Sequence, residues 1–204
     1  MKKKLFFTGS VFQFYVPEIK KYAFCKYFDF THISSFHGLL AQVFNKFSES
    51  EENNFHELNE CDWLFGPRSM HKWPNLRKET SWKSLGILSS PNDTFIPDFK
   101  GAQAPSIIVE DESKITKWFP VHNLTERGEN CSYSQIKHLE NKTLTTASLG
   151  LSRRTGMEFC RINNLNVANY YDLSDEGIRS AYWQMINVPI YRTIAKEIRG
   201  KSII

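Results

Sequence analysis

Long apolar runs are missing from this chain. Residues 1–7 imitate the charged start of a secretory signal, but Thr8-Gly9-Ser10 follows after only three apolar residues. A signal peptide needs about 7–15 consecutive apolar residues, and a membrane-spanning helix needs about 20. We therefore predict a cytoplasmic protein that makes no contact with a membrane.

Cysteine is also scarce, and its spacing excludes two common uses. The four cysteines are Cys25, Cys61, Cys131 and Cys160, and no two of them form a Cys-x-x-Cys pair. Secreted disulfide scaffolds are smaller and denser in cysteine. We expect buried free thiols in a reducing compartment.

The usual catalytic and phosphate-binding motifs are absent. The chain has no HExxH, no Gly-x-Ser-x-Gly, no GxxxxGK[ST] and no GxGxxG. A metal site could still form from Cys25, His32, His37 and His56, and a thiol–imidazole pair from Cys131 with His122 or His138. Ordinary loop and interior histidines explain these residues more simply. We therefore predict no cofactor, no metal and no catalysis.

The positive charge is too mild and too scattered to indicate a nucleic-acid binder. The formal charge is +4, and the basic runs are residues 2–4, 20–21 and 153–154. Nucleic-acid binders gather such residues on one face. Arg153 and Arg154 lie between Gly150 and Gly156, just before a predicted helix start, where they could bind an anion. A connecting loop whose arginines pair with nearby acids is the alternative.

Aromatic residues are abundant, at 14% with 16 Phe, which is typical of a sheet-based core. We predict an α+β fold, with an antiparallel, barrel-like sheet in residues 1–120 and a smaller, mainly helical part in residues 121–204 packed on it. The apolar and aromatic runs predict strands at 11–16, 22–28, 39–44, 63–65, 81–88, 107–109 and 115–119. Short links between the first three predict an antiparallel meander.

Helix signals are concentrated after residue 130. Ser132 can cap a helix through Leu139, and Thr155 with Glu158 fits a capping box. Asp172 or Ser174 can cap a third helix through residue 186. Residues 189–200 fit either a last helix or an extended tail.

One segment differs in charge from the rest of the chain. Residues 49–62 contain no Lys or Arg, and we name them the acidic segment; their carboxylates are Glu49, Glu51, Glu52, Glu57, Glu60 and Asp62. As a binding face, this segment predicts a basic partner. Trp73, which precedes Pro74 in a predicted loop, is our candidate for an exposed aromatic anchor.

Several of these pieces together resemble one family. They are Gly9-Ser10-Val11-Phe12-Gln13-Phe14, Tyr22-Ala23-Phe24-Cys25-Lys26, a third apolar strand, Trp82-Lys83-Ser84-Leu85-Gly86 and Ile96-Pro97-Asp98-Phe99. Over residues 5–120 the chain is similar to the immunity protein 26 family of bacterial polymorphic toxin systems. Cys25 departs from the family pattern, which usually has glycine there.

The resemblance implies a cytoplasmic immunity protein that binds and neutralises a cognate toxin. Two alternatives stay open. A phosphotriesterase-type label on some members of that grouping suggests a metal-dependent hydrolase, which needs a metal or an activated nucleophile in a pocket. A nucleic-acid-binding module needs the basic runs to meet on one face.

Overall fold

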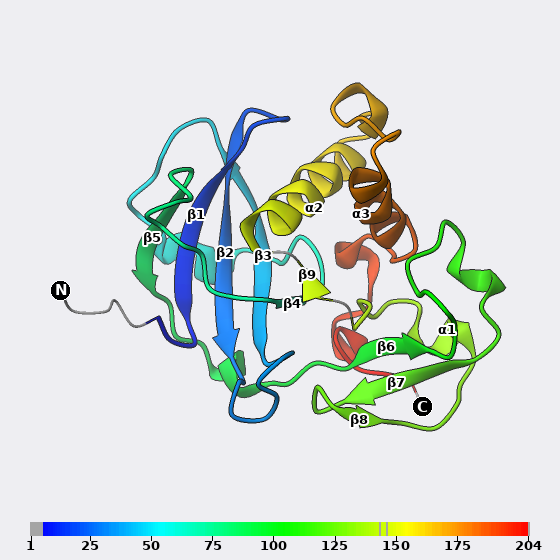
Figure 1. Ribbon diagram of the computed structural model, residues 1–204. Helices are drawn as coiled ribbons and strands as arrows, with labels where there is room; N and C mark the ends of the chain where they lie inside the picture. The colour runs from blue at the N-terminus through cyan, green and yellow to red at the C-terminus, as the bar shows by residue number, and fades with distance from the viewer. Residues whose placement is uncertain (1–5, 143, 146, 204) are drawn as a thin grey trace.

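The computed structural model describes residues 6–142, 144, 145 and 147–203. Six strands form the larger sheet, in the order β5-β1-β2-β3-β4-β9 (Figure 1). They are β1 Ser10–Val16, β2 Lys21–Asp29, β3 Leu39–Ser48, β4 Arg68–Met70, β5 Trp82–Ile87 and β9 Leu144–Thr145. A second sheet contains β6 Phe99–Ala102, β7 Trp118–His122 and β8 Glu126–Arg127.

The predicted antiparallel meander is confirmed, and so is the α+β class. β1 pairs with β2 and β2 pairs with β3, both antiparallel, whereas β4 and β9 pair in parallel. The barrel-like description is only loosely met, because the described strands form an open sheet with β5 and β9 at its edges and no closed barrel. A barrel buries its interior by closing on itself, but here helices bury one face of an open sheet instead.

Three α-helices follow: α1 Tyr133–Ile136, α2 Ala147–Ile162 and α3 Glu176–Ile186. Ser132 caps α1 in a capping box with Gln135, as its position predicted. The predicted capping box of Thr155 with Glu158 is wrong, since both residues lie inside α2, where the Thr155 hydroxyl donates to the Leu151 carbonyl at 2.7 Å. The N-cap of α3 is Asp175, one residue after the nearer candidate.

The two faces of the larger sheet are both apolar, and each is covered by different elements. On β1 to β3, one row of side chains (Phe12, Phe14, Ala23, Cys25, Tyr27, Ala41, Val43) packs with Leu151, Met157 and Cys160 of α2. Gly156 permits this close approach, because a Cβ there would lie 2.9 Å from Cγ1 of Val16 in β1 and 1.9 Å from the Tyr171 hydroxyl. The helices therefore cover one face together with the segment between β4 and β5, which adds Trp73 and Leu76 to the same cluster.

The opposite face is covered by two separate apolar clusters. Leu58 of the acidic segment packs among Val11, Phe24 and Phe44. Farther along, the second sheet packs on the strands through a cluster that contains Phe28, Phe30, Leu40, Phe99, Val121 and Leu124. A gap between these two clusters is where the pocket described below lies.

Some predicted elements differ from the structure. Residues 63–65 contribute only a single bridge, Phe44 to Trp63, and the fourth strand is β4. Residues 107–109 are irregular, and β6 was not predicted. Residues 189–200 form neither a regular helix nor a straight tail, because two 3-10 turns lie there, Tyr191–Thr193 and Lys196–Ile198. The predicted boundary at residue 120 falls inside β7 of the second sheet, and β9, from the predicted C-terminal part, joins the larger sheet. Residues 1–120 and 121–204 therefore both contribute strands to each sheet.

A buried charge network ties α2 to β4. Glu140 binds Arg68 at 2.8 Å and Arg154 at 3.1 Å, and Arg154 also binds Glu158 at 3.0 Å. The side chains of all four residues are at most 6% exposed. Burial alone would raise the pKa of Glu140, but the guanidinium groups of Arg154 and Arg68 hold that pKa below its usual range.

No helix in the described ranges is both long and apolar enough to cross a bilayer.

Candidate functional site

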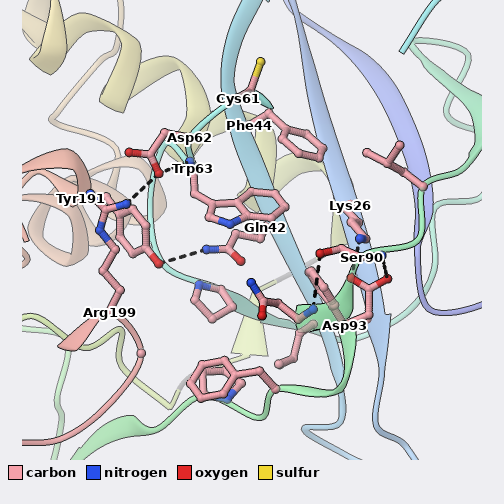
Figure 2. Close-up of a pocket in the computed structure, with 18 of the residues that line it drawn as sticks. Lys26, Gln42, Phe44, Cys61, Asp62, Trp63, Ser90, Asp93, Tyr191 and Arg199 are labelled. Carbon is pink, nitrogen blue, oxygen red and sulfur yellow. Dashed lines mark hydrogen bonds and ion pairs between the residues drawn. The ribbon is translucent and has the colours of Figure 1, made fainter. Parts of the chain in front are cut away.

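A pocket of about 540 Å³ lies on the face of the larger sheet that the helices leave uncovered. Its base is formed by β2 and β3, and its sides by the end of the acidic segment, the 3-10 turn Pro91–Thr94 and the C-terminal residues 191–201 (Figure 2). Its volume lies in the range of small-molecule sites, about 300–1,000 Å³.

Two polar side chains interrupt the apolar rows at the base of this pocket. Lys26 replaces an apolar residue between Phe24 and Phe28 on β2, and Gln42 does the same on β3. The strand register places Lys26 directly opposite Gln42. Since side chains at opposed positions share a face, both point to the pocket, where they are 2% and 7% exposed.

Lys26 is held in place by an ion pair. Its ammonium contacts Asp93, and it also lies 5.4 Å from the centre of the Phe28 ring. The second carboxylate oxygen of Asp93 accepts from the Ser90 amide at 3.0 Å in a capping box. A buried ammonium needs such a partner. One of its three N–H donors is used by Asp93, which leaves donors for an occupant of the pocket.

Gln42 is oriented by two acceptors. Its amide nitrogen donates to the Phe65 carbonyl at 3.2 Å and to the Tyr191 hydroxyl at 3.4 Å. Its amide oxygen makes no hydrogen bond within the described residues, and it is not one of their fully buried unpaired atoms, so solvent in the pocket reaches it. Figure 2 shows the nitrogen directed to Tyr191 and the oxygen directed away from it. This acceptor is thus open to an occupant of the pocket.

Aromatic rings form much of the pocket wall. Trp63 stacks on Phe44 with the ring centroids 4.4 Å apart, and Phe28 meets Trp63 edge-on at 6.3 Å. Phe95, 42% exposed, lines the wall as well. These rings provide flat apolar surfaces against which another ring can stack.

The pocket has an excess of positive charge. Its lining includes four cations, Lys26, Lys196, Arg199 and Lys201, and two carboxylates, Asp62 and Asp93, so two positive charges are in excess. Arg199 binds Asp62 at 2.7 Å and lies over the Tyr191 ring. Lys196 and Lys201 have no ion pair within the described ranges.

The pocket contains one thiol, Cys61, and it is not activated. Burial raises the pKa of this thiol, and Glu57 and Glu60 raise it further, against a lowering effect of Lys46. A reactive cysteine needs a depressed pKa. Among the described residues, no group of three or more His, Cys, Asp or Glu side chains could hold a metal ion.

The candidate thiol–imidazole pair of Cys131 with His122 or His138 does not form either. His122 contacts Asp98 at 2.9 Å, and His138 contacts the Lys201 carbonyl at 2.6 Å. Burial raises the pKa of the Cys131 thiol. Cys131 is therefore not paired with either histidine.

The acidic segment lies over the sheet and is held there by ion pairs. Glu49 pairs with Lys21, Glu51 with Lys83, and Glu52 and Glu57 with Lys46. Asp62 pairs with Arg199, as described above, and Glu60 is exposed with no ion pair in the described chain. These cations come from β2, β3, β5 and the C-terminal segment, so the acidic residues are ordered rather than free.

Trp73 is not the exposed anchor that its loop setting predicted. Its ring lies 5.1 Å from Tyr27, 5.5 Å from Phe6 and 6.5 Å from Phe12. The segment between β4 and β5 crosses the helix-covered face (Figure 1) and places Trp73 against the core. The loop therefore uses its tryptophan for packing.

The predicted position of Arg153 and Arg154 before a helix start is also wrong, and the alternative, pairing with nearby acids, holds for Arg154. Both lie in the middle of α2 rather than before its start, and Arg154 is buried between Glu140 and Glu158. Lys21, from another basic run, pairs with Glu49. The run at residues 2–4 lies outside the described residues. The described basic runs do not gather on one face.

The pocket residues Lys26, Gln42, Asp93 and Tyr191 were not predicted as a site. A signal for two of them is present in the sequence, because Lys26 stands between Phe24 and Phe28, and Gln42 between Leu40 and Phe44, at alternating positions that are otherwise apolar. The contribution of residues 191–201 has no such signal, since those residues are about 150 positions away from Gln42 in the chain.

Comparisons of the chain with protein-family models, with curated proteins and with solved structures find no match.

Proposed function

We propose that this chain is a cytoplasmic immunity protein that binds a cognate bacterial toxin domain and neutralises it without catalysing a reaction. The observation that supports the proposal is the acidic segment, ordered over the sheet by ion pairs from three strands. An ordered surface loses less conformational entropy on binding than a free loop.

The charge of this surface matches a basic partner. Six carboxylates face four paired cations (Lys21, Lys46, Lys83 and Arg199), which leaves two negative charges in excess. The side chains of Glu49, Glu51 and Glu57 remain 57–80% exposed. Exposed charge of one sign accelerates association with a partner of the opposite sign and disfavours other partners.

The family resemblance supports the same function. Three of the five segments on which it rests form β1, β2 and β5, and the acidic segment lies over these strands. The Glu52 amide donates to Gln13 of β1, and Phe55 contacts Gly86 of β5. The surface proposed for the toxin is thus built on the strands that resemble the immunity family.

Co-expression with the product of a neighbouring gene tests the proposal. The wild-type chain should protect cells and bind that product with nanomolar affinity. Reversing two exposed carboxylates, Glu49→Lys with Glu60→Lys, should slow association about tenfold at low salt. Glu129→Lys, an exposed reversal elsewhere, is the control. Failure of the wild-type chain to protect, or equal binding by the double variant, would contradict the proposal.

A further inference from the structure

The pocket and the acidic segment are neighbours with opposite charge. The acidic segment has two negative charges in excess, and the pocket has two positive charges in excess. A basic surface that fits the first is repelled by the second. An occupant that suits the charge of the pocket is therefore anionic.

The base of the pocket contains groups that a ligand can satisfy. The Gln42 amide oxygen is an acceptor without a partner among the described residues, and Lys26 has donors beyond the one that binds Asp93. A ring edge with a donor beside an acceptor would bind both groups.

The aromatic rings of the pocket wall favour a flat ligand. Trp63, Phe44 and Phe28 present ring surfaces or edges on one side, and Phe95 lies near Gly200 on another. Aromatic side chains of this kind stack with nucleobases and similar rings. A long aliphatic chain would leave the polar base of the pocket unsatisfied.

The C-terminal segment supplies the charge. Lys196 and Lys201 are exposed and have no ion pair among the described residues, and Lys201 lies 5.7 Å from the Phe95 ring centre. Arg199, between them in sequence, lines the same pocket. Figure 2 shows Arg199 and Lys26 on opposite sides of the pocket, with Gln42 and Trp63 between them.

We propose that this pocket is a binding site for a small planar aromatic anion. The ring lies against Trp63 with its polar edge at Lys26 and Gln42, and the anionic group lies at the cations of residues 196–201. Nucleoside monophosphates and indole carboxylates share this chemistry. The site goes beyond the proposed function and does not depend on the identity of a toxin.

Calorimetric titration of the full chain tests the site. The probes are ribonucleoside 5′-monophosphates in one arm and indole-3-acetate in the other. At least one should bind with a Kd of about 1 mM or tighter. Inorganic phosphate, which has no ring, and uncharged nucleosides and indole, which have no anion, should each bind at least about tenfold more weakly.

The variants locate the anionic group. Lys196→Glu with Lys201→Glu should weaken binding at least about tenfold, because two cations become anions at exposed positions where folding is unaffected. Lys72→Glu with Lys78→Glu changes the net charge equally at exposed sites outside this pocket and should not alter the Kd. Binding to neither arm, equal binding of phosphate or of the uncharged rings, or an unchanged Kd in the first double variant would overturn the proposal.

Discussion

The buried network around Arg154 and the ion pairs of the acidic segment use the same residue types for different purposes. In the network, each side chain is at most 6% exposed and the charges connect α2, β4 and residue 140. In the acidic segment, the carboxylates of Glu49, Glu51 and Glu57 are more than half exposed. Removing one partner of a buried pair costs about 3–5 kcal/mol, whereas an exposed pair contributes about 0–1 kcal/mol. Burial, not the number of pairs, decides which region stabilises the fold.

The largest effect should come from Arg154→Met. It leaves Glu140 and Glu158 buried with less compensating charge, so the free energy of unfolding should fall by about 3–5 kcal/mol in urea titrations. Arg153→Met is the matched control, because Arg153 is only partly buried and has no ion pair in the described chain. If both variants lost the same free energy of unfolding, the buried network would not stabilise the fold more than its surroundings do.

Lys26→Met tests an intermediate degree of burial. Lys26 is 2% exposed and its partner Asp93 is 14% exposed. Loss of the ammonium leaves a partly buried carboxylate unpaired, which should lower the free energy of unfolding by about 1–3 kcal/mol. Lys83→Met, at an exposed pair, should have a smaller effect in the same assay. A larger loss for Lys83→Met would contradict the ordering by burial.

The pH dependence of the free energy of unfolding should distinguish the buried network from the exposed ion pairs. The folded-state pKa of Glu140 is lowered, so its stabilising effect is present above the ordinary glutamate pKa of about 4.3 and is lost as the pH falls below it. The stability difference between wild type and Glu140→Gln should therefore narrow from pH 6 to pH 3, measured by urea unfolding. Burial raises the pKa of Glu158 despite Arg154 and Arg161, and this works in the opposite direction. A difference that stays constant with pH would show that Glu140 has the same pKa in the folded and unfolded states, and a difference that widens towards low pH would show that its folded-state pKa is raised.

The smallest effect should come from Glu51→Gln in the acidic segment. Its partner Lys83 is 40% exposed and Glu51 is 58% exposed, so solvent screens the pair. We expect the free energy of unfolding to change by less than about 1 kcal/mol. Glu60→Gln, which breaks no ion pair in the described chain, gives the baseline. A loss as large as that of Arg154→Met would mean that the acidic segment stabilises the fold.

Local pattern predicted the meander well, because alternation of side chains in β1 to β3 is a property of each strand alone. It failed at α2, where Gly150 and Gly156 indicated a loop. Glycine is a weak helix former, but Leu151, Met157 and Cys160 are fully buried against the sheet. That burial outweighs the propensity, and it also places Arg154 inside the network instead of at an anion site.

The sequence by itself determined the α+β class, the strands of the meander, the Ser132 cap and an acidic segment without Lys or Arg. Each of these depends on residues close together in the chain. Only the tertiary structure decided which carboxylates are paired, that Trp73 packs inward, and that Lys26, Gln42 and Tyr191 meet in one pocket. The physical reason is that strand register and the path of residues 191–201 bring together side chains that no local pattern relates.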